Sequence, residues 1–233
     1  MIKKILKWLF IIGIILIGIV AIFLFSINES LPDGAEGKEA DDLAVRILQN
    51  LNYSQFKKTK TIKWSFPGGH HYTWYKSKGT VLVNWNGNQV LLNLVSPEKS
   101  EIIKPATGLN ASDKTALINT ATKFFNNDSF WLVAPYKLFD NGVSRKMVTL
   151  ENGDQALLVT YKSGGSTPGD SYLWILDKNM RPKSFKMWVS IIPVGGLEAT
   201  WENWKTTKSG AVLSQKHKIL FLDLKIEDIT TYN

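Results

Sequence analysis

An uncharged apolar run at Trp8–Phe25 is the feature that most limits what this chain can fold into. As an α-helix the run spans roughly 27 Å, close to the hydrocarbon thickness of a bilayer, and it satisfies its own backbone hydrogen bonds in lipid. Lysines precede the run and acidic residues follow it. Because positive residues stay on the cytoplasmic side, we expect the N-terminus inside and the rest of the chain outside.

These flanks divide the chain into a cytoplasmic stub (1–7), a transmembrane signal-anchor (8–26), a linker (27–39) and an exported domain (40–233). We expect a single-pass protein of the inner (plasma) membrane whose domain is periplasmic or extracellular. The alternative is a cleaved signal peptide. The apolar region of such a peptide is ordinarily about 7–15 residues long and ends at a small-x-small cleavage site. The segment Phe23–Asn28 at the end of this run has no Ala-x-Ala, so we favour the retained anchor.

The composition excludes several classes of function. There is no Cys, which excludes disulfides, thiolate metal sites, cysteine nucleophiles and a lipid-modified cysteine. The three histidines are His70, His71 and His217, and the first two point to opposite faces of a strand, so we expect no metal site and no cofactor. The 28 Lys and Arg against 20 Asp and Glu are mostly scattered lysines, which is not typical of nucleic-acid binding.

Beyond the linker, an amphipathic helix is expected at Ala40–Leu51, and a second helix should end at Asn126-Asn127-Asp128, where Asp128 would cap backbone groups. Period-two runs separated by turn residues predict about eleven strands. These are Lys60–Phe66, His70–Lys76, Thr80–Trp85, Gln89–Val95, Lys146–Glu151, Gln155–Tyr161, Ser171–Leu176, Ser184–Ile191, Leu197–Trp204, Val212–Phe221 and Lys225–Tyr232.

The fold class that follows is α+β, mainly β. A sheet of about eleven antiparallel strands must curl or split, and two helices cannot cover both of its faces. The pattern therefore predicts a strongly curved sheet, a half-barrel, with the two helices on its concave side. Many aromatic residues recur along the strands, so the concave side holds either a packed core or a cavity.

The order of elements resembles the bacterial lipoprotein-carrier superfamily of LolA and LolB type half-barrels. The strings His70-His71-Tyr72-Thr73-Trp74, Asn126-Asn127-Asp128-Ser129-Phe130-Trp131-Leu132 and Thr167-Pro168-Gly169-Asp170-Ser171-Tyr172-Leu173-Trp174 are similar to an uncharacterised branch of Bacteroidetes type. The resemblance implies a non-enzymatic fold that encloses an acyl chain or another apolar ligand between sheet and lid helices. The retained anchor and the absent lipid-modified Cys depart from the carriers, so lipoprotein carriage itself is not expected.

The expected function is a non-catalytic, membrane-anchored envelope protein that binds a lipid or another apolar ligand. Arg46, Phe124 and Phe125 are candidates for the lid or mouth. The candidate lining residues share an aromatic ring and are Trp64, Phe66, Tyr72, Trp74, Trp85, Trp131, Tyr172, Trp174 and Trp188. For each single ring, ordinary core packing remains the competing interpretation.

Two other functions stay open. A packed module could bind a protein or an envelope polymer through an exposed aromatic face, which a contiguous aromatic surface would favour. A hydrolase would need an activated histidine, His70 or His217, but neither lies in a catalytic motif. A hydrogen-bonded structural imidazole beside the Pro67-Gly68-Gly69 turn is the favoured interpretation of His70.

Overall fold

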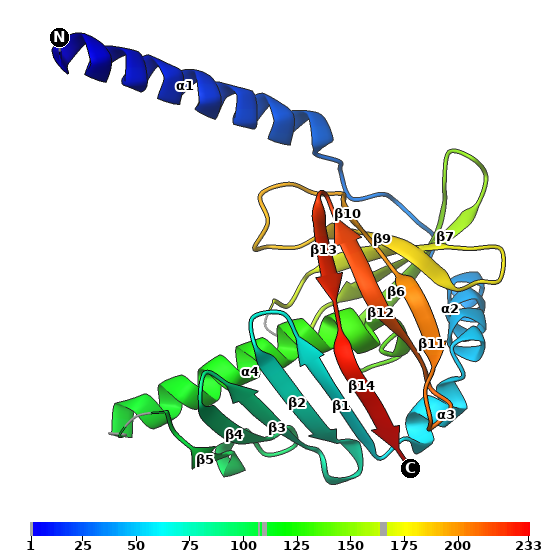
Figure 1. Ribbon diagram of the computed structural model, residues 1–233. Helices are drawn as coiled ribbons and strands as arrows, with labels where there is room; N and C mark the ends of the chain where they lie inside the picture. Colours follow the sequence, from blue (N-terminus) through cyan, green and yellow to red (C-terminus); the bar gives the residue numbers. More distant parts are fainter. Residues whose placement is uncertain (1, 107, 109–110, 164–166) are drawn as a thin grey trace.

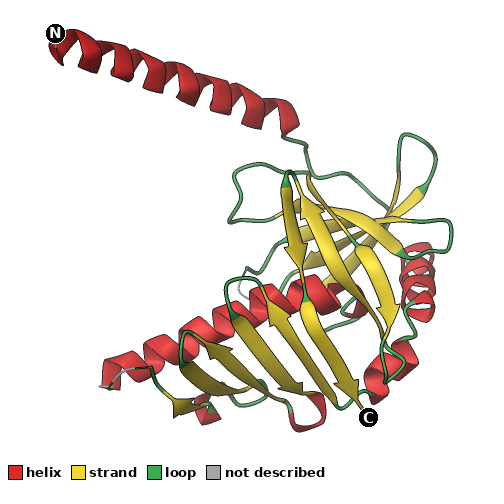
Figure 2. Cartoon of the chain, viewed as in Figure 1, coloured by secondary structure: helices red, strands yellow, loops and turns green. Residues whose placement is uncertain are grey.

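The computed structural model describes residues 2–106, 108, 111–163 and 167–233 and has fourteen strands in two antiparallel sheets (Figure 2). The smaller sheet has the order β14-β1-β2-β3-β4-β5. The larger has the order β11-β12-β10-β9-β8-β7-β6, with β13 paired to β12. Neither sheet closes, and the arrangement is the expected mainly-β half-barrel.

The helices are α1 (Ile2–Ile27), α2 (Lys38–Asn50), α3 (Tyr53–Lys58) and α4 (Ala111–Val133), with short 3₁₀ turns at Lys76–Lys78, Pro97–Lys99 and Ala134–Tyr136. The strands are β1 (Thr61–Phe66), β2 (His70–Tyr75), β3 (Thr80–Trp85), β4 (Asn88–Asn93), β5 (Glu101–Lys104), β6 (Val143–Thr149), β7 (Gln155–Tyr161), β8 (Ser171–Leu176), β9 (Pro182–Trp188), β10 (Leu197–Thr200), β11 (Glu202–Thr206), β12 (Val212–Ile219), β13 (Leu222–Lys225) and β14 (Glu227–Tyr232).

The two sheets are joined through one bent strand segment. Only Ile226 separates β13, which pairs with β12, from β14, which pairs with β1. Trp201 alone divides β10 from β11 in the same way. This second division, together with the unexpected strands β5 and β13, raises the predicted eleven strands to fourteen.

The residue types in the turn between β3 and β4 determine the form of this hairpin in the smaller sheet. Asn86 and Gly87 both have positive φ, 45° and 79°, and they join β3 to β4 with Trp85 opposite Asn88. This is the two-residue turn that the Asn-Gly pair predicts, because both residues tolerate the left-handed backbone region.

Helices α2 and α4 pack on the concave side. The main hydrophobic core includes Leu43 and Ile47 of α2, Phe125 of α4, and inward-facing strand residues such as Trp64 and Trp174. Figure 1 shows α4 crossing the inside of the half-barrel, while α1 projects away from the domain. The apolar span within α1 is Leu6–Ile27, with a mean hydropathy of 3.1, which is long and apolar enough to cross a membrane by length and composition.

Helix α4 does not end at Asn126-Asn127-Asp128 but continues to Val133. Asn and Asp favour helix ends because their side chains compete for backbone hydrogen bonds. Here the carboxylate of Asp128 is engaged by side chains of β2 instead. The expected capping role is therefore wrong, and a tertiary contact outweighs the local preference.

The linker after α1 is docked on the domain. Glu29 donates its backbone N–H to the carbonyl of Gly195 at 2.9 Å and pairs through its carboxylate with Lys186 at 2.6 Å. Ala35 exchanges two backbone hydrogen bonds with Met147 of β6, at 2.9 and 2.8 Å. These contacts tie the linker to the larger sheet at two separate points, so its path is fixed from the end of α1 to the start of α2.

The outer face of the larger sheet carries a second, smaller apolar cluster beside this linker. Val148, Leu158 and Leu173 are buried there, and Trp188 packs against them. The indole N–H of Trp188 donates to the carbonyl of Glu29 at 2.8 Å. The ring of Trp188 therefore supports the linker from the outer side of the sheet.

Gly195→Ala should release the linker from the domain. A Cβ atom at Gly195 would lie 2.3 Å from Cδ1 of Trp188 and 2.6 Å from the carbonyl oxygen of Glu29, so one of them must move. Such overpacking costs about 1–3 kcal/mol. We expect a glutamate-specific protease to cleave after Glu29 faster in this variant than in the parent protein.

The matched control is Gly108→Ala, because a Cβ atom there meets no atom of the described residues within 4 Å. The control should be cleaved at the parental rate. Equal cleavage after Glu29 in all three proteins would contradict a docked linker.

Candidate binding site

Helix α4 contacts both halves of the half-barrel through aromatic side chains. We call the rings on the side of β1–β4 the first aromatic cluster: Trp64, His70, Tyr72, Trp74, Trp85, Phe124 and Phe125. The rings on the side of β8–β12 form the second aromatic cluster: Phe130, Trp131, Tyr172, Trp174, Phe185, Trp201 and His217. The helix supplies two members of each cluster and therefore bridges them.

In the first cluster, Phe125 is surrounded by rings of the smaller sheet. Its ring centroid lies 6.2 Å from that of Trp64 and 5.5 Å from that of Trp74. Phe124 stacks on His70 at 4.0 Å. Offset and edge-to-face contacts of this kind contribute about 0.5–1.5 kcal/mol per pair beyond area burial.

In the second cluster, Phe130 and Trp131 both contact Phe185 of β9, at 5.8 and 5.7 Å. Trp174 of β8 lies 5.7 Å from Trp201, which forms an edge-to-face pair with His217 at 4.6 Å. The cluster is thus a continuous chain of rings from α4 across the larger sheet.

Three buried polar atoms of the second cluster lack hydrogen-bond partners among the described residues. They are the indole Nε1 atoms of Trp174 and Trp201 and Nε2 of His217, and Nε1 of Trp64 in the first cluster shares this condition. A buried polar atom without a partner costs about 1–3 kcal/mol, and native proteins carry few of them. The second cluster therefore holds two buried indole N–H donors without partners among the described residues.

His217 is held in a neutral state. Its Nδ1–H donates to the carbonyl of Thr200 at 2.8 Å. Burial lowers the pKa of His217 to about 4, and the carbonyls of Thr200 and Trp131 oppose that shift only in part, so near neutral pH the ring carries no charge.

A polar contact in the first cluster fastens α4 to β2. Asp128 of α4 is 2% exposed, and its Oδ2 atom lies 2.7 Å from Nδ1 of His70 and accepts a hydrogen bond from the Tyr72 hydroxyl at 2.5 Å. Burial, reinforced by the charge of Asp128, raises the pKa of Tyr72 above its ordinary range, so the hydroxyl stays a donor. We call these three side chains the α4 latch. His70 is thus the hydrogen-bonded imidazole that the sequence favours.

Eight of the nine candidate lining residues lie in or against the main core. Trp64, Tyr72, Trp85, Tyr172 and Trp174 are buried in it, and Phe66, Trp74 and Trp131 pack against it. Trp188 does not join them, because it packs on the outer face beside the linker. The structure therefore brings eight of the nine rings to one side of the sheet.

The three lid or mouth candidates separate. Phe124 and Phe125 occupy the first cluster, whereas Arg46 is exposed on α2. Asp42, the acidic residue one turn before Arg46, pairs with Lys38 at 2.5 Å and not with Arg46. The sequence analysis did not predict that Phe130 is part of an aromatic cluster, or that Asp128 forms hydrogen bonds with side chains of β2. Had the helix been continued past Asp128, the spacing of Phe124 and Trp131 would have placed both on one helical face.

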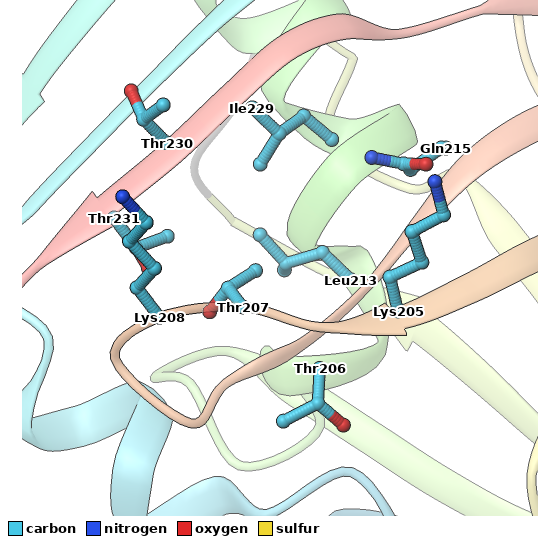
Figure 3. Close-up of a pocket in the computed structure, with 9 residues that line it drawn as sticks. All are labelled: Lys205, Thr206, Thr207, Lys208, Leu213, Gln215, Ile229, Thr230 and Thr231. Atoms are coloured by element: carbon cyan, nitrogen blue, oxygen red, sulfur yellow. The ribbon is translucent and has the colours of Figure 1, made fainter.

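A pocket of about 210 Å³ opens where the two sheets part (Figure 3). It lies between β11, β12 and β14, and we call it the seam pocket. Leu213 and Ile229 line it with apolar surface that belongs to the core or packs on it, and Lys205 and Lys208 add ammonium groups. The remaining lining residues are Thr206, Thr207, Gln215, Thr230 and Thr231. This combination of apolar and cationic groups suits an amphiphilic molecule with an anionic end.

Comparison with known proteins leaves the family open. No protein-family model matches the sequence, and no curated protein matches it. Among solved structures, the chain is similar to a DUF1329 family protein from Desulfovibrio piger ATCC 29098, with a TM-score of 0.46 and 11% sequence identity over 84% of this chain and 93% of that chain. At this level the likeness does not place the chain in that family, and the Bacteroidetes branch stays a prediction.

Asp128→Ala should destabilise the fold by about 2–4 kcal/mol, because it leaves the buried Tyr72 hydroxyl and His70 without their partner. The free energy of unfolding is measured by urea titration of the full-length protein in detergent, followed by tryptophan fluorescence.

Asp140→Ala is the matched control. Asp140 is exposed and lies 3.4 Å from Lys137, and such a surface pair contributes less than about 1 kcal/mol. If both alanine variants lower the free energy of unfolding equally, the α4 latch has no special role.

Proposed function

We propose that the protein is a non-catalytic, membrane-anchored binding module that takes up a lipid or another apolar ligand between its concave wall and α4. The observation that carries this proposal is the aromatic interior with unpaired polar atoms. Trp174 and Trp201 leave two buried indole N–H donors without partners among the described residues. A ligand with an apolar body and a few polar atoms would satisfy both the rings and these groups.

In this proposal α4 is the lid. Its Phe130 and Trp131 rings contact the wall through apolar surface that an acyl chain or another apolar body can replace. The α4 latch then opposes opening, because moving the helix exposes the Asp128 carboxylate and breaks its bonds to β2. The seam pocket supplies an opening on the outside, with apolar surface continuing from Leu213 into the core.

Anchoring by α1 places the binding module where apolar ligands are concentrated. The helix has the length and hydropathy to span a membrane. The lysines before it favour an inside N-terminus, so the half-barrel would lie on the outer side of the plasma membrane.

The alternative, an interaction module with an exposed aromatic face, is less well supported. It requires aromatic anchors on the surface. The eight Trp residues beyond α1 are all buried or half-buried. Seven of these eight Trp rings lie in or against the main core, and Trp188 packs on the outer face beside the linker.

The surface array of Ser65, His71 and Asp228 is not arranged as a catalytic triad. The Ser65 hydroxyl donates to Oδ2 of Asp228 at 2.7 Å and lies 2.9 Å from Nδ1 of His71. The single hydroxyl proton is thus directed to the carboxylate, and His71 can only donate to Ser65. In a catalytic triad the imidazole lies between serine and carboxylate and accepts the serine proton. Here the serine occupies the middle position.

The proposal predicts a covalent adduct inside the half-barrel when the full-length protein meets a photoreactive lipid in cells. Cells are fed a fatty acid that carries a diazirine and an alkyne and are then irradiated, and modified peptides are mapped by mass spectrometry. Because the ligand would contact the second aromatic cluster, we expect adducts in α4 and β8–β10 as well as in α1.

Matched variants sharpen the test. Asp128→Asn keeps the size of the side chain but weakens the α4 latch, so it should raise the adduct yield in the half-barrel. Asp140→Asn changes an exposed carboxylate and should leave the yield at the parental level. Adducts confined to α1 in all three proteins would contradict the proposed ligand site while leaving the anchor intact.

A further inference from the structure

Two neighbouring turns of the larger sheet expose large apolar side chains. In the β12–β13 turn, Leu220, Phe221 and Leu222 are 58%, 89% and 56% exposed. In the β9–β10 loop, Ile191 is 73% exposed. We call these four residues the apolar tip. Scattered apolar residues are common on protein surfaces, but exposed apolar residues grouped in one place indicate a contact.

The turn geometry makes these residues more unusual. Ile219 pairs with Leu222, so Leu220 and Phe221 are the two turn residues, and Leu220 has a positive φ of 53°. The β3–β4 hairpin also has a two-residue turn, and its turn residues are Asn86 and Gly87. A left-handed backbone costs a residue such as leucine about 1–2 kcal/mol, a cost that glycine avoids. Folding therefore does not require Leu-Phe at this turn, whereas an external apolar contact would.

The apolar tip lies at the end of the domain to which α1 is attached. The backbone N–H of Gly195, in the β9–β10 loop, donates to Oδ1 of Asn28 at 2.8 Å, one residue after α1 ends at Ile27. The pairing of Ala199 with Ile219 brings the β12–β13 turn to the same end. Figure 1 shows this turn and the β9–β10 loop beneath the last turn of α1.

We propose that the apolar tip inserts into the outer leaflet of the same membrane that α1 spans, so that the half-barrel rests on the bilayer in one fixed orientation. The inference rests on the proposed anchoring by α1. The docked linker restricts rotation of the domain about the anchor, because Glu29 and Ala35 are tied to β9–β10 and to β6. Leucine, isoleucine and phenylalanine on a membrane-facing surface gain burial at the boundary between headgroups and acyl chains.

Charge at the tip is compatible with this placement. Lys216 lies 3.3 Å from Asp223, and the carboxylate of Glu29 is paired with Lys186. Lys218 is exposed beside the turn, where its ammonium group can reach lipid phosphate while its stem lies along apolar surface. Two acidic groups near the tip, Asp223 and Glu29, are thus paired with lysines.

The test uses single-cysteine variants of the full-length protein, which is possible because the chain contains no Cys. Phe221→Cys reports on the tip, and Ile17→Cys reports on α1. Val95→Cys is the matched control, because Val95 is 79% exposed and follows β4 at the opposite end of the molecule. Strand pairing from Tyr232 through Thr61, Tyr75 and Thr80 to Asn93 places it there.

Each variant is labelled with an environment-sensitive NBD dye and reconstituted into vesicles of phosphatidylcholine with a minority of phosphatidylglycerol. Lipids that carry a doxyl group near the headgroup quench from within the bilayer, and iodide quenches from water. We expect the dye at Phe221 to show a blue-shifted emission, to be quenched by the doxyl lipid and to be protected from iodide. The dye at Val95 should behave in the opposite way.

The dye at Ile17 distinguishes failure of the proposed anchoring by α1 from failure of the proposed insertion of the apolar tip. If it is quenched by a doxyl group deeper in the chain while the Phe221 dye responds to iodide as the Val95 dye does, the anchor stands and the tip insertion is wrong. If the Ile17 dye is open to iodide, the anchoring proposal itself fails. Protection of the Phe221 dye from both quenchers would mean that protein covers the tip, which also overturns the bilayer as its partner.

Discussion

The packing of α4 against the concave wall is the contact on which both halves of the half-barrel depend. The two sheets share the bent segment at Ile226, and α4 joins them a second time by placing Phe125 among the rings of one and Phe130 among the rings of the other. Any displacement of α4 therefore opens both aromatic clusters together. A lid over a single binding site would have to expose both clusters at once in this way.

Two opposing effects determine how stable the closed position of α4 is. Ring contacts and apolar burial stabilise the closed arrangement, and each good aromatic pair adds about 0.5–1.5 kcal/mol. Buried indole N–H groups without partners among the described residues oppose it by a comparable amount each. The Asp128 carboxylate compensates in the first cluster through His70 and Tyr72. The second cluster holds two of the three unpartnered indole N–H groups among the described residues, which is why we propose that a ligand enters on that side.

Local patterns in the sequence were sufficient to predict most of the strands and the mainly-β half-barrel. Alternating runs and the Asn86-Gly87 turn determine the first hairpins, because side-chain period and turn type are local properties. The end of α4 was predicted wrongly, because the partners of Asp128 lie far away in sequence on β2. Trp188 could not be assigned to a face for a similar reason. Strand parity gives two equivalent faces, and only the docked linker shows that this ring lies on the outer one.

The mobility of α4 tests the account most directly. Hydrogen–deuterium exchange of the full-length protein compares the amides of Phe124–Trp131 with those of β8 and β9, which the helix covers. A lid opens without global unfolding, so its amides exchange through a local event of lower free energy. We predict that the α4 amides exchange faster than those of β8 and β9 under native conditions. Equally slow exchange in the helix and both strands would show that α4 leaves the wall only when the whole domain unfolds, and it would contradict the lid.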